Sequence, residues 1–342
     1  MKALLKESSE PGLVLKDVTK PKAGKGELLV KVKAASICGS DLHLYEWNRW
    51  AKKRLLPPMI IGHEFVGDVE EIGIGVSGFE KGDLVSCETH IFCGYCRQCR
   101  LGQRHLCANT KVIGFDRQGA FAEYISIPAV CAWLTTPELD LYVAALQEPF
   151  GNAVHATLSA PIAGSNILVT GGGPIGIMAV TVARACGASK IIVSEPNEYR
   201  RNLALKMGAN KALDPDHEDL VEGVQLATKN IGIDVLLEMS GSPRALSDGL
   251  SALRAGGFAA LMGIPDDVVQ LDITDNIIFK GVTLKGIIGR KLFESWYQGQ
   301  AMLTSGKVNL APLVTHRFQI ENFKEAFDIG LSGDCGKIVF TI

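Results

Sequence analysis

The chain has 342 residues, of which 47% are hydrophobic and 21% are charged, a balance typical of a globular protein of about two domains. Its formal net charge is −2, and its longest basic run is Lys52-Lys53-Arg54. This pattern offers no electrostatic surface for nucleic acid or an anionic membrane. We therefore expect small molecules and copies of the chain itself as partners.

The N-terminal segment and the cysteines both bear on where the protein works. Charged residues begin at Lys2, too early for the apolar part of a signal peptide, and no apolar run approaches 18 residues. Four of the nine cysteines lie in one tight cluster, which favours metal binding by reduced thiols over disulfides. We expect a cytoplasmic protein. The cysteines without ligand spacing are expected to be small buried or half-buried side chains, namely Cys87, Cys131, Cys186 and Cys335.

The first part of the chain is predicted to be rich in β-strands. Residues Leu28 to Ala35 and Phe65 to Gly73 are apolar or alternating, contain β-branched side chains, and are bounded by turn residues. Cys38 follows the first of these segments, and Gly62-His63-Glu64 precedes the second. One cysteine, one histidine and a carboxylate form a mixed ligand set that leaves a zinc position open for chemistry.

Two carboxylates are alternatives for the third ligand of this catalytic zinc. Glu64 adjoins His63, and Glu148 lies where the β-rich part ends. Exchange on the metal would let both take part. Ser40 and His43 follow Cys38 and supply a hydroxyl and an imidazole at a spacing suited to a short proton path.

A second zinc site is predicted in the segment 87–110. It offers four thiolates, which close a tetrahedral site and leave no position for substrate, so we expect a structural zinc. A zinc module that binds nucleic acid is a poor alternative, because no recognition helix separates the ligand pairs. The four ligands are Cys93, Cys96, Cys99 and Cys107.

From about Pro149 onward, helical apolar stretches alternate with short strands, which predicts a doubly wound parallel sheet. The strand at Ile167 to Thr170 runs into Gly171, Gly173 and Gly176, a GxGxxG turn, and then into an apolar helix. In this context the motif predicts a dinucleotide site. The other predicted strands are Ile191–Ser194, Asp234–Leu237, Phe258–Met262 and Val282–Lys285, followed after about Phe293 by a helix, Val314–Ile320 and Lys337–Ile342.

Glu195 ends the next strand, close to the distance at which a carboxylate accepts the ribose hydroxyls. A carboxylate there repels a 2′-phosphate, which favours NAD over NADP. Arg200 and Arg201 weaken this preference slightly, since an arginine receives that phosphate in NADP enzymes.

Together these features resemble the zinc-containing medium-chain dehydrogenase/reductase superfamily over essentially the entire chain. Within it, the chain is similar to the L-threonine 3-dehydrogenase family. The most discriminating segment is Tyr45-Glu-Trp47, and further matching segments begin at Cys38, Gly151, Gly173, Asn197 and Gly281. Threonine is usual in that family where this chain has Ser40, which keeps the hydroxyl.

The resemblance implies an α/β protein with two domains. Residues 1–150 and 292–342 would form a GroES-like, β-rich catalytic domain, and residues 151–291 an inserted Rossmann domain. It also implies a homotetramer. NAD contacts are expected at Ile175, Glu195, Arg200, Met262, Gly263, Ile264, Gly286 and Ile287, besides the glycines of the turn.

The expected reaction is oxidation of L-threonine to L-2-amino-3-oxobutanoate with hydride transfer to NAD, in threonine catabolism. Zinc would act as a Lewis acid on the hydroxyl, Ser40 and His43 would carry its proton away, and Glu148 would assist. Arg49 or Arg54 is a candidate partner for the substrate carboxylate. One alternative is a polyol or 2,3-butanediol dehydrogenase of the same superfamily. Another is a non-catalytic nucleotide-binding protein, which predicts one zinc per chain instead of two.

Overall fold

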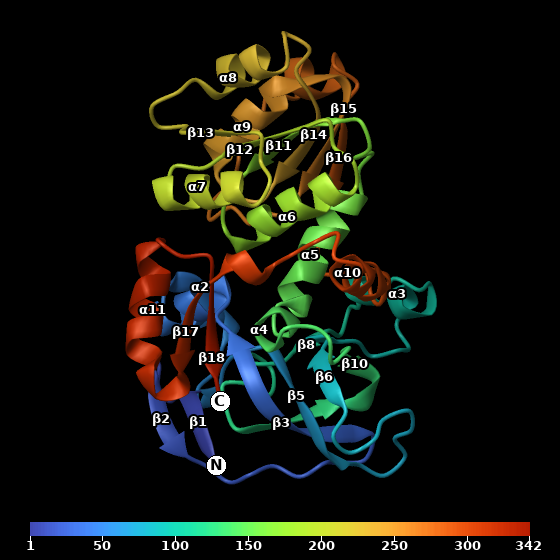
Figure 1. Cartoon of the computed structure of the whole chain (residues 1–342), viewed down its shortest axis with the longest axis vertical. Coiled ribbons are helices and arrows are strands. Elements are labelled where there is room, and N and C mark those ends of the chain that lie inside the picture. Colours follow the sequence, from blue (N-terminus) through green and yellow to red (C-terminus); the bar gives the residue numbers. More distant parts are fainter. The chain divides into compact units, whose positions relative to one another are not determined.

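The strand β3 (Glu27–Ser36) lies at the centre of a seven-stranded sheet in the first of two units (Figure 1). Most of β3 is buried on both faces, and its buried aliphatic side chains are Leu28, Leu29, Val30, Val32, Ala34 and Ala35. Gly67 of the neighbouring strand lies opposite β3, where a Cβ atom would come within 2.2 Å of the Lys31 carbonyl oxygen. A side chain at this position is therefore excluded by the close approach of the two strands.

The computed structural model covers residues 1–342. The first unit comprises residues 1–149, 291–296 and 314–342, and the second comprises residues 150–290 and 297–313. The segment 297–313 thus lies with the second unit, whereas the sequence had suggested a single C-terminal return to the first domain from residue 292. No helix in the chain has both the length and the apolar character needed to cross a membrane.

The first unit contains three sheets. The seven-stranded sheet has the spatial order β10 (Ala132–Leu134), β6 (Leu84–Cys87), β5 (Glu64–Ile72), β3, β18 (Lys337–Thr341) and β17 (Val314–Gln319), with β9 (Tyr124–Pro128) also paired to β3. A three-stranded sheet has the order β2 (Val14–Asp17), β1 (Lys2–Lys6) and β4 (Met59–Ile60). The third is the pair β7 (His90–Ile91) and β8 (Lys111–Val112).

Short helices cover parts of these sheets and close the core. Tyr45 stacks on Phe327 at 4.7 Å between ring centroids, which packs α1 (Gly39–Glu46) against α11 (Phe323–Ser332). Phe121 meets Phe340 edge to face at 5.3 Å, beneath the same helices. Such pairs contribute about 1 kcal/mol each beyond the burial of their surface. The remaining helices are α2 (Arg49–Arg54), α3 (Arg97–Arg100) and α4 (Leu141–Ala144), and α5 (Gln147–Leu158) begins in this unit and continues in the second.

The second unit is a six-stranded parallel sheet with helices on its faces (Figure 1). Its strand order is that of a Rossmann fold: β13 (Lys211–Leu213), β12 (Lys190–Ser194), β11 (Asn166–Thr170), β14 (Ile233–Glu238), β15 (Leu253–Leu261) and β16 (Thr283–Gly286). Its helices are α6 (Pro174–Ala185), α7 (Glu198–Lys206), α8 (Leu220–Ala227) and α9 (Pro243–Ala252), and α10 (Glu294–Thr304) begins in the first unit. The predicted fold class, a GroES-like β-rich domain plus a Rossmann domain, is confirmed.

The glycine turn before α6 has a steric cause. Gly171 has a φ of 90°, a conformation that side chains rarely adopt, and it leads β11 into the turn. At Gly176 a Cβ atom would lie 1.9 Å from the Gly171 carbonyl oxygen. The helix can approach the strand this closely only because both positions lack a side chain.

Candidate metal and nucleotide sites

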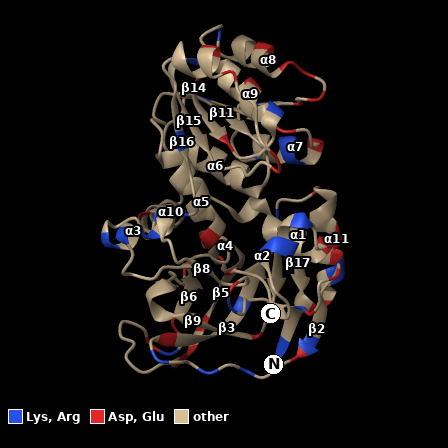
Figure 2. Ribbon diagram, turned by 180° about the vertical axis from the view of Figure 1, so that it is seen from behind, with Lys and Arg blue, Asp and Glu red and all other residues tan.

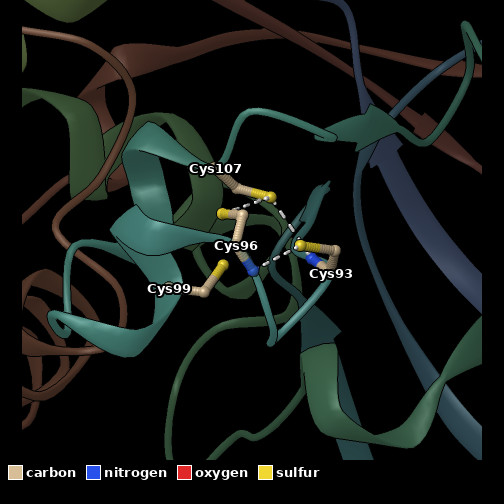
Figure 3. Close-up of side chains that lie close together, drawn as sticks. All are labelled: Cys93, Cys96, Cys99 and Cys107. Atoms are coloured by element: carbon tan, nitrogen blue, oxygen red, sulfur yellow. Dashed lines mark hydrogen bonds between the residues drawn. The ribbon is translucent and has the colours of Figure 1, made fainter.

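The four clustered cysteines converge in space as predicted. The Sγ atoms of Cys93, Cys96, Cys99 and Cys107 all lie within 4.8 Å of one another, and all four point toward a common centre (Figure 3). The loop that brings them together is held at its base by the pairing of β7 with β8. This arrangement fits a closed tetrahedral zinc site of four thiolates.

The hydrogen bonds around the sulfur atoms favour thiolates. The backbone N–H groups of Cys93 and Asn109 both donate to Cys107 Sγ at 3.3 Å, and the N–H of Cys96 donates to Cys93 Sγ at 3.4 Å. Desolvation opposes ionisation of Cys93, but the donors from Asn109 and the backbone outweigh it and lower the pKa of this thiol to about 6. Burial and the neighbouring sulfurs raise the pKa of Cys99 to about 12, a repulsion that a bound cation would relieve.

A second cluster lies at the ends of β3 and β5. One ligand atom each from Cys38, His63 and Glu64 lies within 4.8 Å of the others. Cys38 is the N-cap of α1, directly after β3, and His63 follows Gly62, which has a φ of 87° and packs its Cα against Phe121. The donor set of sulfur, nitrogen and oxygen fits zinc.

Asp41 supports two of these residues and was not recognised from the sequence. It has no exposure, and its Oδ2 atom accepts the backbone N–H of Cys38 at 3.0 Å. Its Oδ1 atom lies 3.8 Å from His63 Nδ1, and neither of these buried atoms has a hydrogen-bond partner. A carboxylate behind a histidine is the usual support of a metal ligand, so this spacing fits a ligating His63 that donates to Asp41.

The electrostatics of the cluster favour a cation. Burial opposes protonation of His63, but the charges of Asp41, Cys38 and Glu148 outweigh it and raise its pKa to about 10. Burial raises the pKa of Asp41 to about 6. This concentration of buried anions is the environment that a divalent cation stabilises.

The two competing carboxylates differ in their partners. Glu64 Oε2 accepts hydrogen bonds from Ser36 Oγ and from the ammonium group of Lys337, and Lys337 also donates to the Ile37 carbonyl at 2.9 Å. Burial would lower the pKa of Lys337, but the charges of Glu64, Cys38 and Glu148 raise it. Glu64 is thus paired with a buried cation inside the cluster.

Glu148, in the first turn of α5, lies outside the group of mutually close ligand atoms. It is 4% exposed, and its Oε1 atom accepts a hydrogen bond from Thr89 Oγ1 at 2.7 Å. Its charge contributes to the raised pKa values of His63 and Lys337, so its carboxylate lies close enough to act on the cluster.

The proposed proton path lies on α1. Ser40 is half-buried and His43 is exposed one helical turn further on. No hydrogen bond joins them. Instead, Asn48 Nδ2 donates to His43 Nδ1 at 2.8 Å while Asn48 Oδ1 accepts the N–H of Ala51 as the N-cap of α2.

The candidate arginines for substrate differ in their availability. Both terminal nitrogens of Arg54 donate to the carboxylate of Asp116, at 2.9 and 2.7 Å. Arg49 is exposed on the first turn of α2. Lys and Arg residues lie on α2 and α3 (Figure 2), and on α2 they are Arg49, Lys52, Lys53 and Arg54.

A pocket of about 400 Å³ lies at the carboxyl ends of the parallel strands in the second unit. Gly171, Gly173, Glu195 and Arg200, which the sequence singled out for a dinucleotide site, line this pocket. Glu195 is 4% exposed, and its two oxygens accept the N–H groups of Gly172 at 2.6 Å and Asn197 at 2.9 Å. These bonds fix its carboxylate beside the glycine turn.

Arg200 and Arg201 have separate roles in this region. Arg200 lines the pocket, and its buried Nε atom has no hydrogen-bond partner. Arg201 pairs with Asp214 at 3.0 Å and donates to the Glu195 carbonyl. The lining residues that the sequence did not single out include Ser194, Asp216, Ser240, Arg244 and Asp248.

The other predicted nucleotide contacts lie outside the residues that line the pocket, near the same strand ends. Met262 and Gly263 donate their N–H groups to the Glu238 carbonyl, and Ile287 donates to Leu261 at 2.9 Å. At Gly263 a Cβ atom would come within 2.1 Å of the Gly241 nitrogen, so glycine is required there. Ile264 is exposed, Ile287 is buried, and Ile175 and Gly286 lie at the start of α6 and the end of β16.

Comparison with known proteins identifies the family of the chain. Residues 24–137 match the family model of the alcohol dehydrogenase GroES-like domain, and residues 174–305 match that of the zinc-binding dehydrogenases. The chain is 48% identical to L-threonine 3-dehydrogenase of Pyrococcus furiosus, over 100% of this chain and 99% of the relative. It is 45% identical to L-threonine 3-dehydrogenase of Bacillus subtilis, over 99% of this chain and 98% of the relative.

The chain belongs to the L-threonine 3-dehydrogenase family of zinc-containing medium-chain dehydrogenases. Solved structures agree with the fold of this dehydrogenase family. An alcohol dehydrogenase from Thermus sp. ATN1 has a TM-score of 0.92 and 30% identity, over 100% of this chain and 99% of the other. A putative zinc-binding dehydrogenase from Sinorhizobium meliloti, bound to NADP, has a TM-score of 0.92 and 28% identity with the same coverage.

Proposed function

We propose that this chain oxidises the secondary alcohol of L-threonine to L-2-amino-3-oxobutanoate and transfers the hydride to NAD. The observation that carries the substrate assignment is its full-length identity of 44% to 48% to L-threonine 3-dehydrogenases of archaea and bacteria. The grouping of Cys38, His63 and Glu64 supports the zinc-dependent chemistry, and the pocket at the glycine turn supports a dinucleotide.

In this mechanism Cys38, His63 and a carboxylate would hold the catalytic zinc, and Cys93, Cys96, Cys99 and Cys107 the structural zinc. Bound zinc supplies Lewis acidity toward the substrate hydroxyl, and NAD supplies the hydride acceptor. Asp41 orients His63 and fixes the backbone of Cys38. Lys337 and Ser36 hold Glu64, and Glu148 would be the second carboxylate available to the metal.

The proton leaves along α1. Ser40 Oγ takes the proton of the substrate hydroxyl and passes it toward His43, whose exposed ring releases it to solvent. Asn48 donates to His43 Nδ1 and fixes the ring, and this bond opens when Nδ1 takes the proton from Ser40 while Nε2 releases one to water. Arg49, the unpaired member of the two candidate arginines, is the better partner for the carboxylate of the substrate amino acid.

Glu195 supports NAD as the cofactor. Its carboxylate is fixed by two backbone donors beside the pocket, where it would accept the ribose hydroxyls and repel a 2′-phosphate. The remaining NAD contacts would come from the glycine turn, Ile175, Arg200, Met262 to Ile264, Gly286 and Ile287.

A substrate panel tests the proposal. NADH formation by the zinc-loaded protein should be clearly faster with L-threonine than with D-threonine, L-serine, 2,3-butanediol or sorbitol. Turnover with only the diol or the polyol would assign the chain to a polyol or 2,3-butanediol dehydrogenase activity. No turnover, with one zinc per chain instead of two, would favour a non-catalytic nucleotide-binding protein.

Zinc stoichiometry tests the two sites separately. Cys93→Ser should reduce the zinc content from two to one per chain, because three thiolates and a hydroxyl bind zinc far more weakly. Cys186→Ser is the matched control, since Cys186 is half-buried and belongs to neither cluster. An unchanged content in Cys93→Ser would contradict the structural site.

We also propose a cytoplasmic homotetramer. All nine cysteines are free, which supports a reducing compartment. The edge strand β16 is exposed along its whole length and contains the exposed Leu284, and the segment before it carries the exposed apolar side chains of Ile278 and Phe279. An unpaired apolar edge favours pairing with another copy. Sedimentation of the parent chain and of Leu284→Lys measures this, and a monomeric parent would exclude it.

A further inference from the structure

We propose that Thr89 is a positioning residue for Glu148, holding one carboxylate oxygen so that this side chain can join the ligand set of the catalytic zinc. The inference rests on the catalytic zinc site proposed above. Thr89 is 1% exposed and Glu148 is 4% exposed, and the Oγ1 to Oε1 distance is 2.7 Å. A hydrogen bond to a buried carboxylate is about twice as strong as one between neutral groups.

The turn that carries Thr89 is fixed at successive residues. The N–H of Glu88 donates to the Cys131 carbonyl at 2.8 Å, and the Thr89 carbonyl accepts the N–H of Ile113 at 3.1 Å. The N–H of His90 donates to Glu88 Oε1 at 2.8 Å. Thr89 therefore has little freedom to follow Glu148 if that side chain moves away.

Glu88 adds an anchor from a distant part of the chain. It has no exposure, and its Oε2 atom accepts the indole N–H of Trp296 at 2.8 Å. Trp296 packs on Trp133 at 5.5 Å between ring centroids. The turn at Thr89 is therefore held by backbone bonds to Cys131 and Ile113 and by the segment at Trp296.

The helix on the other side of the contact is fixed as well. Gln147, next to Glu148, donates to Thr135 Oγ1 at 2.8 Å and to the Ala144 carbonyl at 3.2 Å. With both backbones held, the Thr89 hydroxyl selects the orientation of the Glu148 side chain. In this proposal Thr89 acts on the metal through its hydrogen bond to Glu148.

The position of Thr89 also links the two zinc sites. His90 and Ile91, directly after Thr89, form β7, and β7 pairs with β8 at the base of the cysteine loop. Cys93 follows two residues later. A folded cysteine loop thus keeps β7 in place, and β7 directly follows Thr89.

The test is the release of zinc to a chromogenic chelator, which needs no substrate and is independent of the threonine assignment. Thr89→Val keeps the shape of the side chain and removes the donor. It should release one of the two zinc ions about 10- to 100-fold faster than the parent, as for other supporting partners of metal ligands. Thr89→Ser keeps the hydroxyl and should restore slow release.

A double-mutant cycle separates positioning from a general structural effect. In a Glu148→Gln background, Thr89→Val should change the release rate little further, because its effect passes through the Glu148 carboxylate. Thr157→Val is the control on the same helix, since the buried Thr157 hydroxyl has no partner. It should release zinc like the parent.

Release from Thr89→Val at the parent rate would overturn the proposal, as would an equal acceleration in the Glu148→Gln background. If Thr89→Val does not fold, Thr89→Ala takes its place in both comparisons. Release of both zinc ions at the parent rate by the Thr89 variants would reject the positioning role. Inactivity of the parent on L-threonine would reject the substrate assignment, and the two results are independent.

Discussion

Lys337 and Glu64 form an ion pair with side-chain exposures of only 3% and 1%. The pair joins β18, the last strand of the chain, to the first residue of β5. Because Lys337 also donates to the carbonyl of Ile37, it holds the backbone just before Cys38 and the carboxylate just after His63. One buried cation from the C-terminal end thus braces both segments of the candidate catalytic zinc site.

Lys337→Met should destabilise the fold by about 3 to 5 kcal/mol, because it leaves the Glu64 carboxylate buried without a cation. Urea unfolding of the zinc-free proteins measures this. Lys2→Met is the control, since the Lys2–Glu321 pair is about half exposed and its loss should hardly change the midpoint. A Lys337→Met protein as stable as the parent would show that Glu64 does not need this partner.

The strands and the nucleotide turn could be predicted from the sequence because their causes are local. Apolar runs with β-branched residues predicted β3 and β12. The spacing of Gly171, Gly173 and Gly176 predicted the turn, because a side chain at Gly176 would prevent the close approach of helix and strand. The ligand clusters were predictable because cysteine and histidine at such spacings have few other uses.

No local pattern in the sequence predicted the contacts that support the ligand residues. Lys337 and Glu64 are 273 residues apart and Thr89 and Glu148 are 59 residues apart, and a single sequence carries no information on which distant residues meet. Asp41 could have been predicted from the sequence, because it lies three residues after Cys38, where a carboxylate commonly caps a helix. The sequence also could not show that Arg54 is already paired with Asp116.

The Arg54–Asp116 pair predicts a pH dependence of stability. Hydrogen bonding by Arg54 lowers the pKa of Asp116 below its ordinary value of 3.8. The pair therefore stabilises the fold fully above about pH 4 and loses this contribution as the pH falls through the lowered pKa.

Arg54→Met should cost about 1 kcal/mol at pH 7, discounted because both side chains are about a third exposed, and less near pH 2. Urea unfolding at several pH values measures the difference. A variant with unchanged stability but a strongly raised KM for L-threonine would instead assign Arg54 to the substrate carboxylate. Arg49→Met is the comparison. It should leave the stability unchanged and strongly raise the KM for L-threonine.

Ser40→Ala should lower kcat by about 100-fold and change the Kd for NAD little, because the hydroxyl is proposed to carry a proton and not to bind the cofactor. Ser40→Thr keeps the hydroxyl and should retain most of the activity. Steady-state kinetics and fluorescence titration with NADH separate the two quantities. Equal turnover in Ser40→Ala would remove this residue from the proton path.

Glu195→Ala should narrow the preference for NAD over NADP, since it removes the fixed carboxylate that repels a 2′-phosphate while Arg200 stays beside the pocket. We expect kcat/KM for NAD to fall about 10- to 100-fold, in line with the loss of one or two hydrogen bonds to a charged group. The kcat/KM ratio for the two cofactors is the measurement. Glu198→Ala, on the exposed first turn of α7, is the control and should leave the ratio unchanged. A ratio that stays the same in Glu195→Ala would mean that another residue reads the ribose.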